Sequence, residues 1–228
     1  MADVIMIHQT GGPEVLTFEQ QDVGDPGPGE ARILQEAVGL NFIDVYFRSG
    51  LYPAPSGLPF IPGNEGAGTV TALGEGVCGL SVGDRVAYTG PIGAYASERL
   101  LPADKLIRLA DDIDFGTAAA MMLKGLTAQY LLRQTFRVQK GQTILIHAAA
   151  GGVGLIACQW ANHLGATVIG TAGSAQKTEL AKAHGCHHVI NYKEEDFVAR
   201  VADITGGEKC DVVYDSVGKD TFRDRWTA

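Results

Sequence analysis

The chain has 228 residues, a hydrophobic fraction of 46% and a mean hydropathy near zero, so it can form one large domain or two modest ones. A net charge of −8 leaves no basic face for nucleic acid or an anionic membrane, and no apolar run is long enough to cross a bilayer. The first eight residues have neither the basic start nor the apolar core of a signal peptide. We therefore expect a cytoplasmic protein that binds neither nucleic acid nor membranes.

The first part of the chain is predicted to be rich in short strands separated by glycine and proline turns. A short helix is predicted at residues 42–48, ended by Gly50, and residues 52–59 carry too much proline for a helix or a strand. Many short strands with tight turns are typical of a small barrel-like domain. Strands are expected at residues 4–8, 15–18, 31–38, 69–73 and 93–100, and residues 82–88 are expected to combine a tight turn with another strand.

The pattern changes from Phe115 onward, where two helices are predicted on either side of Gly125. Strands and helices then alternate, which predicts a parallel sheet with helices on both faces. We place the domain boundary near Lys124. The predicted helices are residues 115–124, 127–136, 155–164, 175–184 and 194–204, and the predicted strands are residues 143–147, 167–171, 189–190 and 211–215.

A glycine cluster follows the apolar strand at residues 143–147 and opens a helix. Strand, glycine turn and helix form the start of a dinucleotide-binding βαβ unit. Gly151 and Gly152 let the backbone approach a pyrophosphate, and Gly154 lets the helix lie near its strand. Ala149 replaces the first glycine of the fingerprint, so the motif alone is weak. The βα units around it make the prediction much stronger.

The end of the second strand indicates which nicotinamide cofactor is bound. An NAD site carries an acid there, whereas residues 170–174 contain none and the next acid is Glu179. Ser174 stands at a helix N-cap position with Lys177 three residues on, where a hydroxyl, N–H groups and an ammonium can meet a 2′-phosphate. The alternative is an ordinary serine cap and a solvated lysine. We favour NADPH, with Tyr192 packing on the adenine or simply ending the third strand.

The cysteines are far apart in the sequence and never form a C-x-x-C pair, which disfavours a zinc cluster or a disulfide framework. We interpret them as ordinary core thiols. We expect His187 and His188 on the surface and His147 in the core. The cysteines are Cys78, Cys158, Cys186 and Cys210.

Six short motifs, spread over the chain as far as about residue 222, are specific when taken together. They are Gly39-Leu-Asn-Phe-Ile-Asp44, Pro62-Gly-Asn-Glu-Gly-Ala-Gly68, Gly83-Asp-Arg-Val86, Lys124-Gly-Leu-Thr-Ala128, Ala148-Ala-Ala-Gly-Gly-Val-Gly154 and Tyr214-Asp-Ser-Val-Gly218. With them the chain resembles the zinc-independent, ζ-crystallin-like quinone oxidoreductases of the medium-chain dehydrogenase/reductase superfamily. The resemblance implies an α/β protein with a GroES-like β-barrel domain at residues 1–124 and a Rossmann doubly wound parallel sheet at residues 125–228.

The same resemblance implies hydride transfer from NADPH to a quinone. It places Asn41 on the cofactor's ribose and amide and Thr127 on its carboxamide, while Tyr46 and Tyr52 stack on the acceptor or give it a proton. Half-buried tyrosines with their hydroxyls in water are the alternative. The implied cofactor-binding residues are Asn41, Thr127, Tyr130, Gly151, Gly152, Val153, Gly154, Thr171, Gly173, Ser174, Lys177, Tyr192, Ser216 and Val217.

No metal is expected. Zinc-dependent relatives carry a cysteine at the position of Asn41 and a histidine at that of Asn64, and asparagine is a poor zinc ligand. Without a Lewis acid, the favoured direction is hydride delivery to an electron-poor acceptor. Asp44 is interpreted as a cap of the short helix.

The resemblance also implies roughly another third of a chain after Gly218, which would complete the sheet. Residues 223–228 do not resemble the family. An open sheet edge predicts poor solubility or association, and the family's dimer interface would lie in the additional segment. Two alternatives stay open: a reductase of α,β-unsaturated carbonyls that uses the same hydride chemistry, and a truncated, non-catalytic nucleotide-binding or structural protein.

Overall fold

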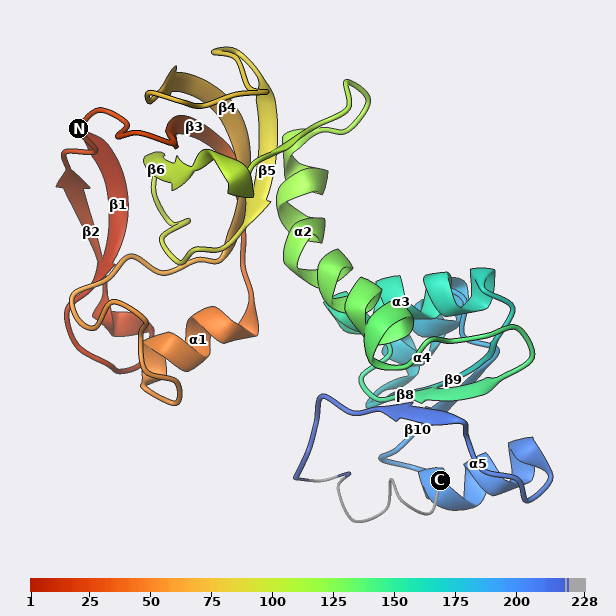
Figure 1. The fold of residues 1–228 in the computed structure, drawn as a ribbon. Coiled ribbons are helices and arrows are strands. Elements are labelled where there is room, and N and C mark those ends of the chain that lie inside the picture. Colours follow the sequence, from red (N-terminus) through yellow and green to blue (C-terminus); the bar gives the residue numbers. More distant parts are fainter. Residues whose placement is uncertain (220, 222–228) are drawn as a thin grey trace. The chain divides into compact units, whose positions relative to one another are not determined.

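A computed structural model describes residues 1–219 and residue 221. The chain forms two compact units, Met1–Leu123 and Lys124–Ala228 (Figure 1). The first contains mostly antiparallel strands, and the second alternates strands and helices around a parallel sheet. The predicted α/β class is therefore confirmed.

The first unit is built on a five-stranded antiparallel sheet in the order β6-β3-β4-β5-β7. A separate hairpin pairs β1 with β2. The bounds are β1 Ala2–Ile7, β2 Leu16–Gln21, β3 Glu30–Gly39, β4 Glu65–Leu73, β5 Arg85–Thr89, β6 Glu98–Pro102 and β7 Ile107–Arg108, with 3₁₀ turns at Pro13–Val15 and Ala103–Lys105.

The core of this unit follows from the alternation of side chains along the strands. Ala31 and Ile33 on β3 point to the same side as Val86 and Tyr88 on β5, and all four are buried. The central pair of strands lies unusually close, because a Cβ on Gly68 would be 2.1 Å from the carbonyl oxygen of Leu34. Glycine at that point lets β3 and β4 approach.

Helix α1, Phe42–Ser49, is the helix expected at residues 42–48. Gly50 ends it with a φ of 78°, the left-handed conformation that glycine adopts without strain. The proline-rich residues 52–59 that follow lie in a loop, as predicted.

Two strands in the first part of the chain were predicted with the wrong start, and one strand was missed. The strand expected at residues 69–73 begins four residues earlier, at Glu65. The strand expected at residues 93–100 begins only at Glu98, because the preceding segment forms turns and isolated bridges. The strand β7 was not anticipated, since two residues carry no readable alternation.

The two helices expected around Gly125 are one helix. Helix α2 runs over Phe115–Tyr130 and continues as a π-helical turn, Leu131–Thr135. A glycine inside a helix costs about 1 kcal/mol relative to alanine, and the alanine, leucine, methionine and lysine residues around it favour the helix strongly enough to offset that cost.

The second unit contains a four-stranded parallel sheet in the order β10-β9-β8-β11. The predicted βα alternation is confirmed, although α5 begins three residues later than expected. The strands are β8 Thr143–Ile146, β9 Thr167–Ala172, β10 His188–Asn191 and β11 Val212–Tyr214, and the helices are α3 Gly152–His163, α4 Ala175–Ala183 and α5 Phe197–Thr205.

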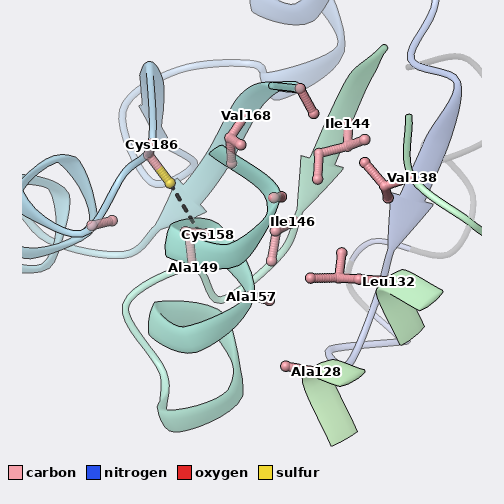
Figure 2. Packing of buried hydrophobic residues seen from close by; sticks show 13 residues of the cluster. Ala128, Leu132, Val138, Ile144, Ile146, Ala149, Ala157, Cys158, Val168 and Cys186 are labelled. Carbon is pink, nitrogen blue, oxygen red and sulfur yellow. Dashed lines mark hydrogen bonds between the residues drawn. The ribbon is translucent and has the colours of Figure 1, made fainter. Parts of the chain in front are cut away.

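Alternate residues of β8 face opposite sides of this sheet. Ile144 and Ile146 pack with α2, α3 and α4, as Figure 2 shows for one side. Leu145 lies between them in sequence and packs with α5 through Phe197 and Val201. Helices therefore cover both faces, as a parallel sheet requires.

Two of the four cysteines meet in this core. Cys158 on α3 and Cys186 before β10 are buried, and their sulfurs lie 3.2 Å apart (Figure 2). The neighbouring Cys186 thiol and burial together raise the pKa of Cys158, so it stays protonated as a core thiol. The interpretation as core thiols fails for Cys78, which is exposed.

In the described residues, no helix is both long and apolar enough to span a membrane. The divergent residues 223–228 lie outside the described part of the chain.

Candidate functional site

The turn between β8 and α3 has the geometry of a dinucleotide-binding loop. Ala148 adopts a positive φ of 52°, and the N–H of Ala149 donates to the Thr171 carbonyl, which ties the turn to the neighbouring strand. A Cβ on Gly154 would lie 2.5 Å from the Ala148 carbonyl oxygen. Only glycine at this position lets α3 lie so close to the end of its strand.

The exposed side of this turn consists of Gly151 and Gly152, which precede Val153 in the first turn of α3. Helix geometry leaves the first N–H groups of α3 without intrahelical acceptors. The aliphatic stem of Lys124 lies over Gly152, with its Cδ atom 2.7 Å from where a Cβ would be. Lys124 begins one of the six sequence motifs, but the sequence does not show that its side chain lies beside this loop.

The end of β9 and the start of α4 form a second exposed cluster. The Ser174 hydroxyl caps α4 by accepting the Lys177 N–H at 3.3 Å, and both residues are exposed. Tyr192, directly after β10, lies against Gly173, since a Cβ there would be 2.6 Å from the tyrosine hydroxyl. The structure thus brings together Gly173, Ser174, Lys177 and Tyr192, all predicted cofactor residues.

The side chain of Thr171 points into the core, unlike those of the exposed cluster. It is buried in β9, and its hydroxyl lies 3.0 Å from Nδ1 of the buried His147. The imidazole packs edge-on against Phe197 with ring centroids 5.0 Å apart. His147 is therefore a core residue, as expected. His187 and His188 are exposed, also as expected.

The loop after β11 places Ser216 and Val217 on the surface of the second unit. Asp215 shapes this loop by accepting the N–H groups of Val217 and Gly218 and the hydroxyl of Thr221 at 2.8–3.0 Å. Burial raises the pKa of Asp215, but these hydrogen bonds and the nearby His147 outweigh it and hold that pKa below its usual value.

Thr127 and Tyr130 lie one turn apart on α2, so both are on one face of the helix. Thr127 is partly buried and Tyr130 is exposed.

In the first unit, Asn41 stands at the N-cap of α1 with its side chain buried. Its Nδ2 donates to Oε1 of Glu65 at 2.7 Å. The other oxygen of Glu65 accepts the backbone N–H of Leu123 on α2, also at 2.7 Å. Glu65 is completely buried.

A second buried carboxylate lies beside Asn41. Asp44 accepts the Asn41 N–H at 2.9 Å, so it does cap α1 as interpreted. It also accepts Nδ2 of Asn64 at 2.7 Å and the hydroxyl of Tyr95 at 3.0 Å. Burial and the charge of Asp44 raise the pKa of Tyr95, so its hydroxyl remains a donor. The motifs contained Asp44, Asn64 and Glu65, but these contacts join distant segments and could not be read from spacing.

Tyr46 and Tyr52 form an edge-to-face pair with ring centroids 5.3 Å apart. The Tyr52 N–H donates to the Tyr46 carbonyl, which joins α1 to the proline-rich loop. Tyr46 is partly buried and Tyr52 is 47% exposed. The pair therefore offers aromatic surface and hydroxyl groups at the edge of the first unit.

Among the described residues, no group of three or more histidine, cysteine, aspartate or glutamate side chains is arranged to hold a metal ion.

Two family models match the chain in order. Residues 27–111 match "Alcohol dehydrogenase GroES-like domain" and residues 152–227 match "Zinc-binding dehydrogenase". This pair of domains, together with the barrel-type unit and the parallel sheet, defines the medium-chain dehydrogenase/reductase class.

Comparison with similar proteins identifies the family within this class. A quinone oxidoreductase from Pseudomonas aeruginosa is 57% identical, with 97% of this chain and 68% of the relative aligned. A 2-haloacrylate reductase from Burkholderia is 50% identical over 98% of this chain and 68% of that protein. The crystal structure of an Escherichia coli quinone oxidoreductase complexed with NADPH matches with a TM-score of 0.96 at 50% identity, covering 99% of this chain and 69% of the other. The chain belongs to the quinone oxidoreductase family.

Proposed function

We propose that this chain is an oxidoreductase that uses NADPH to reduce quinones by hydride transfer. The observation that carries the proposal is its 50% identity and TM-score of 0.96 to a quinone oxidoreductase solved with NADPH. The glycine turn before α3 and the cluster at the start of α4 supply the local chemistry that such a cofactor requires.

The glycine turn fits a pyrophosphate. Gly151 and Gly152 are exposed and have no side chains to keep phosphates away, and the N-terminus of α3 offers N–H groups and a positive dipole end. Gly154 cannot be replaced without displacing α3 from this position. We assign Gly151, Gly152 and Val153 to the phosphates and Gly154 to the support of the turn.

The start of α4 fits the adenosine 2′-phosphate that distinguishes NADPH from NADH. Ser174 and the ammonium of Lys177 supply donors, and no acid lies at this end of β9 to repel a phosphate. Tyr192 lies over Gly173 with half its surface exposed, and we assign it to the adenine. Thr171 supports this cluster from within the sheet.

The cofactor supplies a hydride to the acceptor when bound. We assign Asn41, Thr127 and Tyr130 to the nicotinamide half of the cofactor, together with Ser216 and Val217 from the loop after β11. Tyr46 and Tyr52 provide aromatic surface for a planar quinone, and their hydroxyls can give the acceptor oxygen a proton.

We also propose that the reaction needs no metal. Asn41 and Asn64 occupy the positions of the zinc ligands of zinc-dependent relatives, and their amide nitrogens donate to Glu65 and Asp44. Asparagine could offer zinc only a neutral amide oxygen, which is a poor ligand for that ion. A quinone needs little further activation, since conjugation stabilises its reduced oxygen.

The first test is NADPH oxidation by the purified chain with 1,4-benzoquinone, followed at the NADPH absorbance band before and after dialysis against a chelator. We expect quinone-dependent oxidation, faster with NADPH than with NADH and unchanged by dialysis. Binding of NADPH without any turnover would contradict the proposed activity of this chain and favour a nucleotide-binding protein.

The assignment of the 2′-phosphate site is tested by Lys177→Ala. Loss of a charge-assisted contact is expected to weaken NADPH binding by about 1.5–3 kcal/mol and to leave NADH binding nearly unchanged. Lys182→Ala is the matched control, because Lys182 lies on the same helix and pairs with Glu179. Equal losses in the two variants, measured by NADPH fluorescence titration, would refute the assignment.

A second candidate reaction is the reduction of the C=C bond in α,β-unsaturated carbonyl compounds. The 50% identity to a 2-haloacrylate reductase over nearly the whole chain favours it specifically. The same assay with 2-chloroacrylate and with methyl vinyl ketone distinguishes the candidates, since a quinone-specific enzyme leaves both compounds unreduced.

A further inference from the structure

The side chain of Asn41 is held by a residue to which no role has yet been given. Glu65 faces the amide with a carboxylate oxygen at 2.7 Å. A carboxylate only accepts hydrogen bonds, so the end of the amide that faces it is Nδ2, and the carbonyl oxygen Oδ1 lies at the end away from Glu65. Glu65 thereby decides which end of the amide is turned outward, that is, away from Glu65.

Glu65 has no freedom to change this arrangement. It is the first residue of β4, paired with Gly39 on β3 and Thr89 on β5, and it is completely buried. A Cβ on Gly39 would lie 2.2 Å from Oε1 of Glu65, so glycine at that point makes the room that the carboxylate occupies. Its other oxygen is engaged by the Leu123 N–H.

The backbone of Asn41 is held independently. Asp44 accepts the Asn41 N–H and is itself fixed by Asn64 and Tyr95. Asn41 is therefore constrained at its backbone by one buried carboxylate and at its side chain by another. Asn41 and Asp44 form a capping box at the start of α1, in which the Asp44 carboxylate accepts the Asn41 N–H and the Asn41 side chain faces the backbone of Asp44. Glu65 contacts the Nδ2 end of the same amide, and this contact is additional to the box.

We propose that Glu65 is a positioning residue, which fixes the Asn41 amide with Oδ1 outward and holds it in register with α2 through the Leu123 N–H. The inference rests on the role proposed above for Asn41 in binding the cofactor. It adds that the orientation of the amide, and not only its presence, determines affinity.

The geometry predicts what Glu65→Gln does. The backbone N–H of Leu123 is fixed and needs an acceptor, so the side-chain oxygen of the new glutamine faces Leu123. The NH₂ group of the glutamine then takes the position that faces Asn41. The Asn41 amide then turns over, offers Oδ1 to that NH₂ group and presents Nδ2 outward. We expect NADPH binding to weaken about tenfold, the size of one hydrogen bond made to the wrong end of an amide.

A paired substitution restores the outward acceptor. In Asn41→Asp with Glu65→Gln, the new amide donates to one oxygen of the aspartate and the other oxygen faces outward. Asn41→Asp alone places two carboxylates in contact and is expected to bind worst. Rescue of NADPH affinity to within about threefold of the parent is expected for the pair only.

The experiment combines two readouts on the full chain. Exchange of the Asn41 side-chain amide protons, followed by NMR without cofactor, reports the contact itself, and NADPH titration of the folded protein reports its consequence. We expect a protected Nδ2 proton in the parent chain, an unprotected one in Glu65→Gln, and no change in either readout for the exposed control Glu36→Gln.

The outcomes separate this inference from the proposed function. Rapid exchange of Asn41 Nδ2 in the parent, or parent-like NADPH affinity in folded Glu65→Gln, would overturn the inference. If Glu65→Gln does not fold, the inference is tested by exchange of the Asn41 side-chain protons in the parent and by the NADPH affinity of the paired variant. Rapid exchange in the parent, or no rescue of affinity in the paired variant, would overturn it. A parent chain that fails to bind NADPH refutes the proposed function instead, and the exchange measurement still tests the contact.

Discussion

Gly154 occupies a position where a single added carbon has a large effect. A Cβ there would lie 2.5 Å from the Ala148 carbonyl oxygen and 2.6 Å from that of Ala149, which are both backbone atoms of the cofactor turn. Backbone cannot move aside as a flexible side chain can. The glycine therefore serves the packing of α3, and through it the position of the N–H groups that we propose bind the phosphates.

Gly154→Ala is expected to lower the free energy of unfolding by about 1–3 kcal/mol, the usual cost of overpacking, and to weaken NADPH binding. Gly125→Ala is the matched control, since a Cβ at that position in α2 meets no atom within 4 Å. It is expected to raise stability by about 0.5–1 kcal/mol. Urea unfolding measures both, and a neutral Gly154→Ala would contradict the packing argument.

The carboxyl group of Asp215 makes the stability of the fold depend on pH in the acidic range. Its folded-state pKa is lowered by hydrogen bonds, so it contributes stability above the unfolded-state pKa of about 3.9, and that contribution is lost as the pH falls through the folded-state value. Asp215→Asn is expected to cost about 1 kcal/mol at pH 7. The difference from the parent should shrink as the pH falls below about 4 in urea titrations.

At the scale of the secondary-structure elements, the sequence predicted the features that are determined by residues close together in the chain. The strand–turn–helix of β8 and α3 was recognised because its signals lie within a short stretch of the chain. The break expected at Gly125 was wrong, because the residues around a glycine can sustain a helix. The partners of Glu65 were not foreseen, since Asn41 and Leu123 are 24 and 58 residues away and meet it only in the folded chain.

The central strand β8 is expected to dominate the stability of the second unit. Ile144 is completely buried against the helices on one face of the sheet, so Ile144→Ala should cost about 2–5 kcal/mol. Ile107→Ala in β7 is the matched control, because that side chain is 52% exposed and its loss should cost less than about 1 kcal/mol. Chemical unfolding followed by circular dichroism compares the two, and similar costs would show that burial is not the deciding quantity.

At the scale of the whole molecule, each compact unit carries its own set of proposed cofactor residues. Asn41, Tyr46 and Tyr52 belong to the first unit. The glycine turn and the cluster at the start of α4 belong to the second, which therefore holds the residues assigned to the phosphates and the adenine. The preference for NADPH over NADH should accordingly appear in the unfolding of the second unit.

Trp160 packs against the core of that unit, and no tryptophan precedes it in the sequence, so its fluorescence reports the unfolding of the second unit. A ligand present at about a hundred times its Kd stabilises the folded state by about 2.7 kcal/mol. At one concentration of cofactor, NADPH should therefore raise the midpoint of the tryptophan transition by several degrees, and NADH by clearly less. In Lys177→Ala the two cofactors should become equivalent, because the charge that distinguishes a 2′-phosphate from a hydroxyl is gone. A shift of equal size with both cofactors in the parent chain would place the discrimination outside α4.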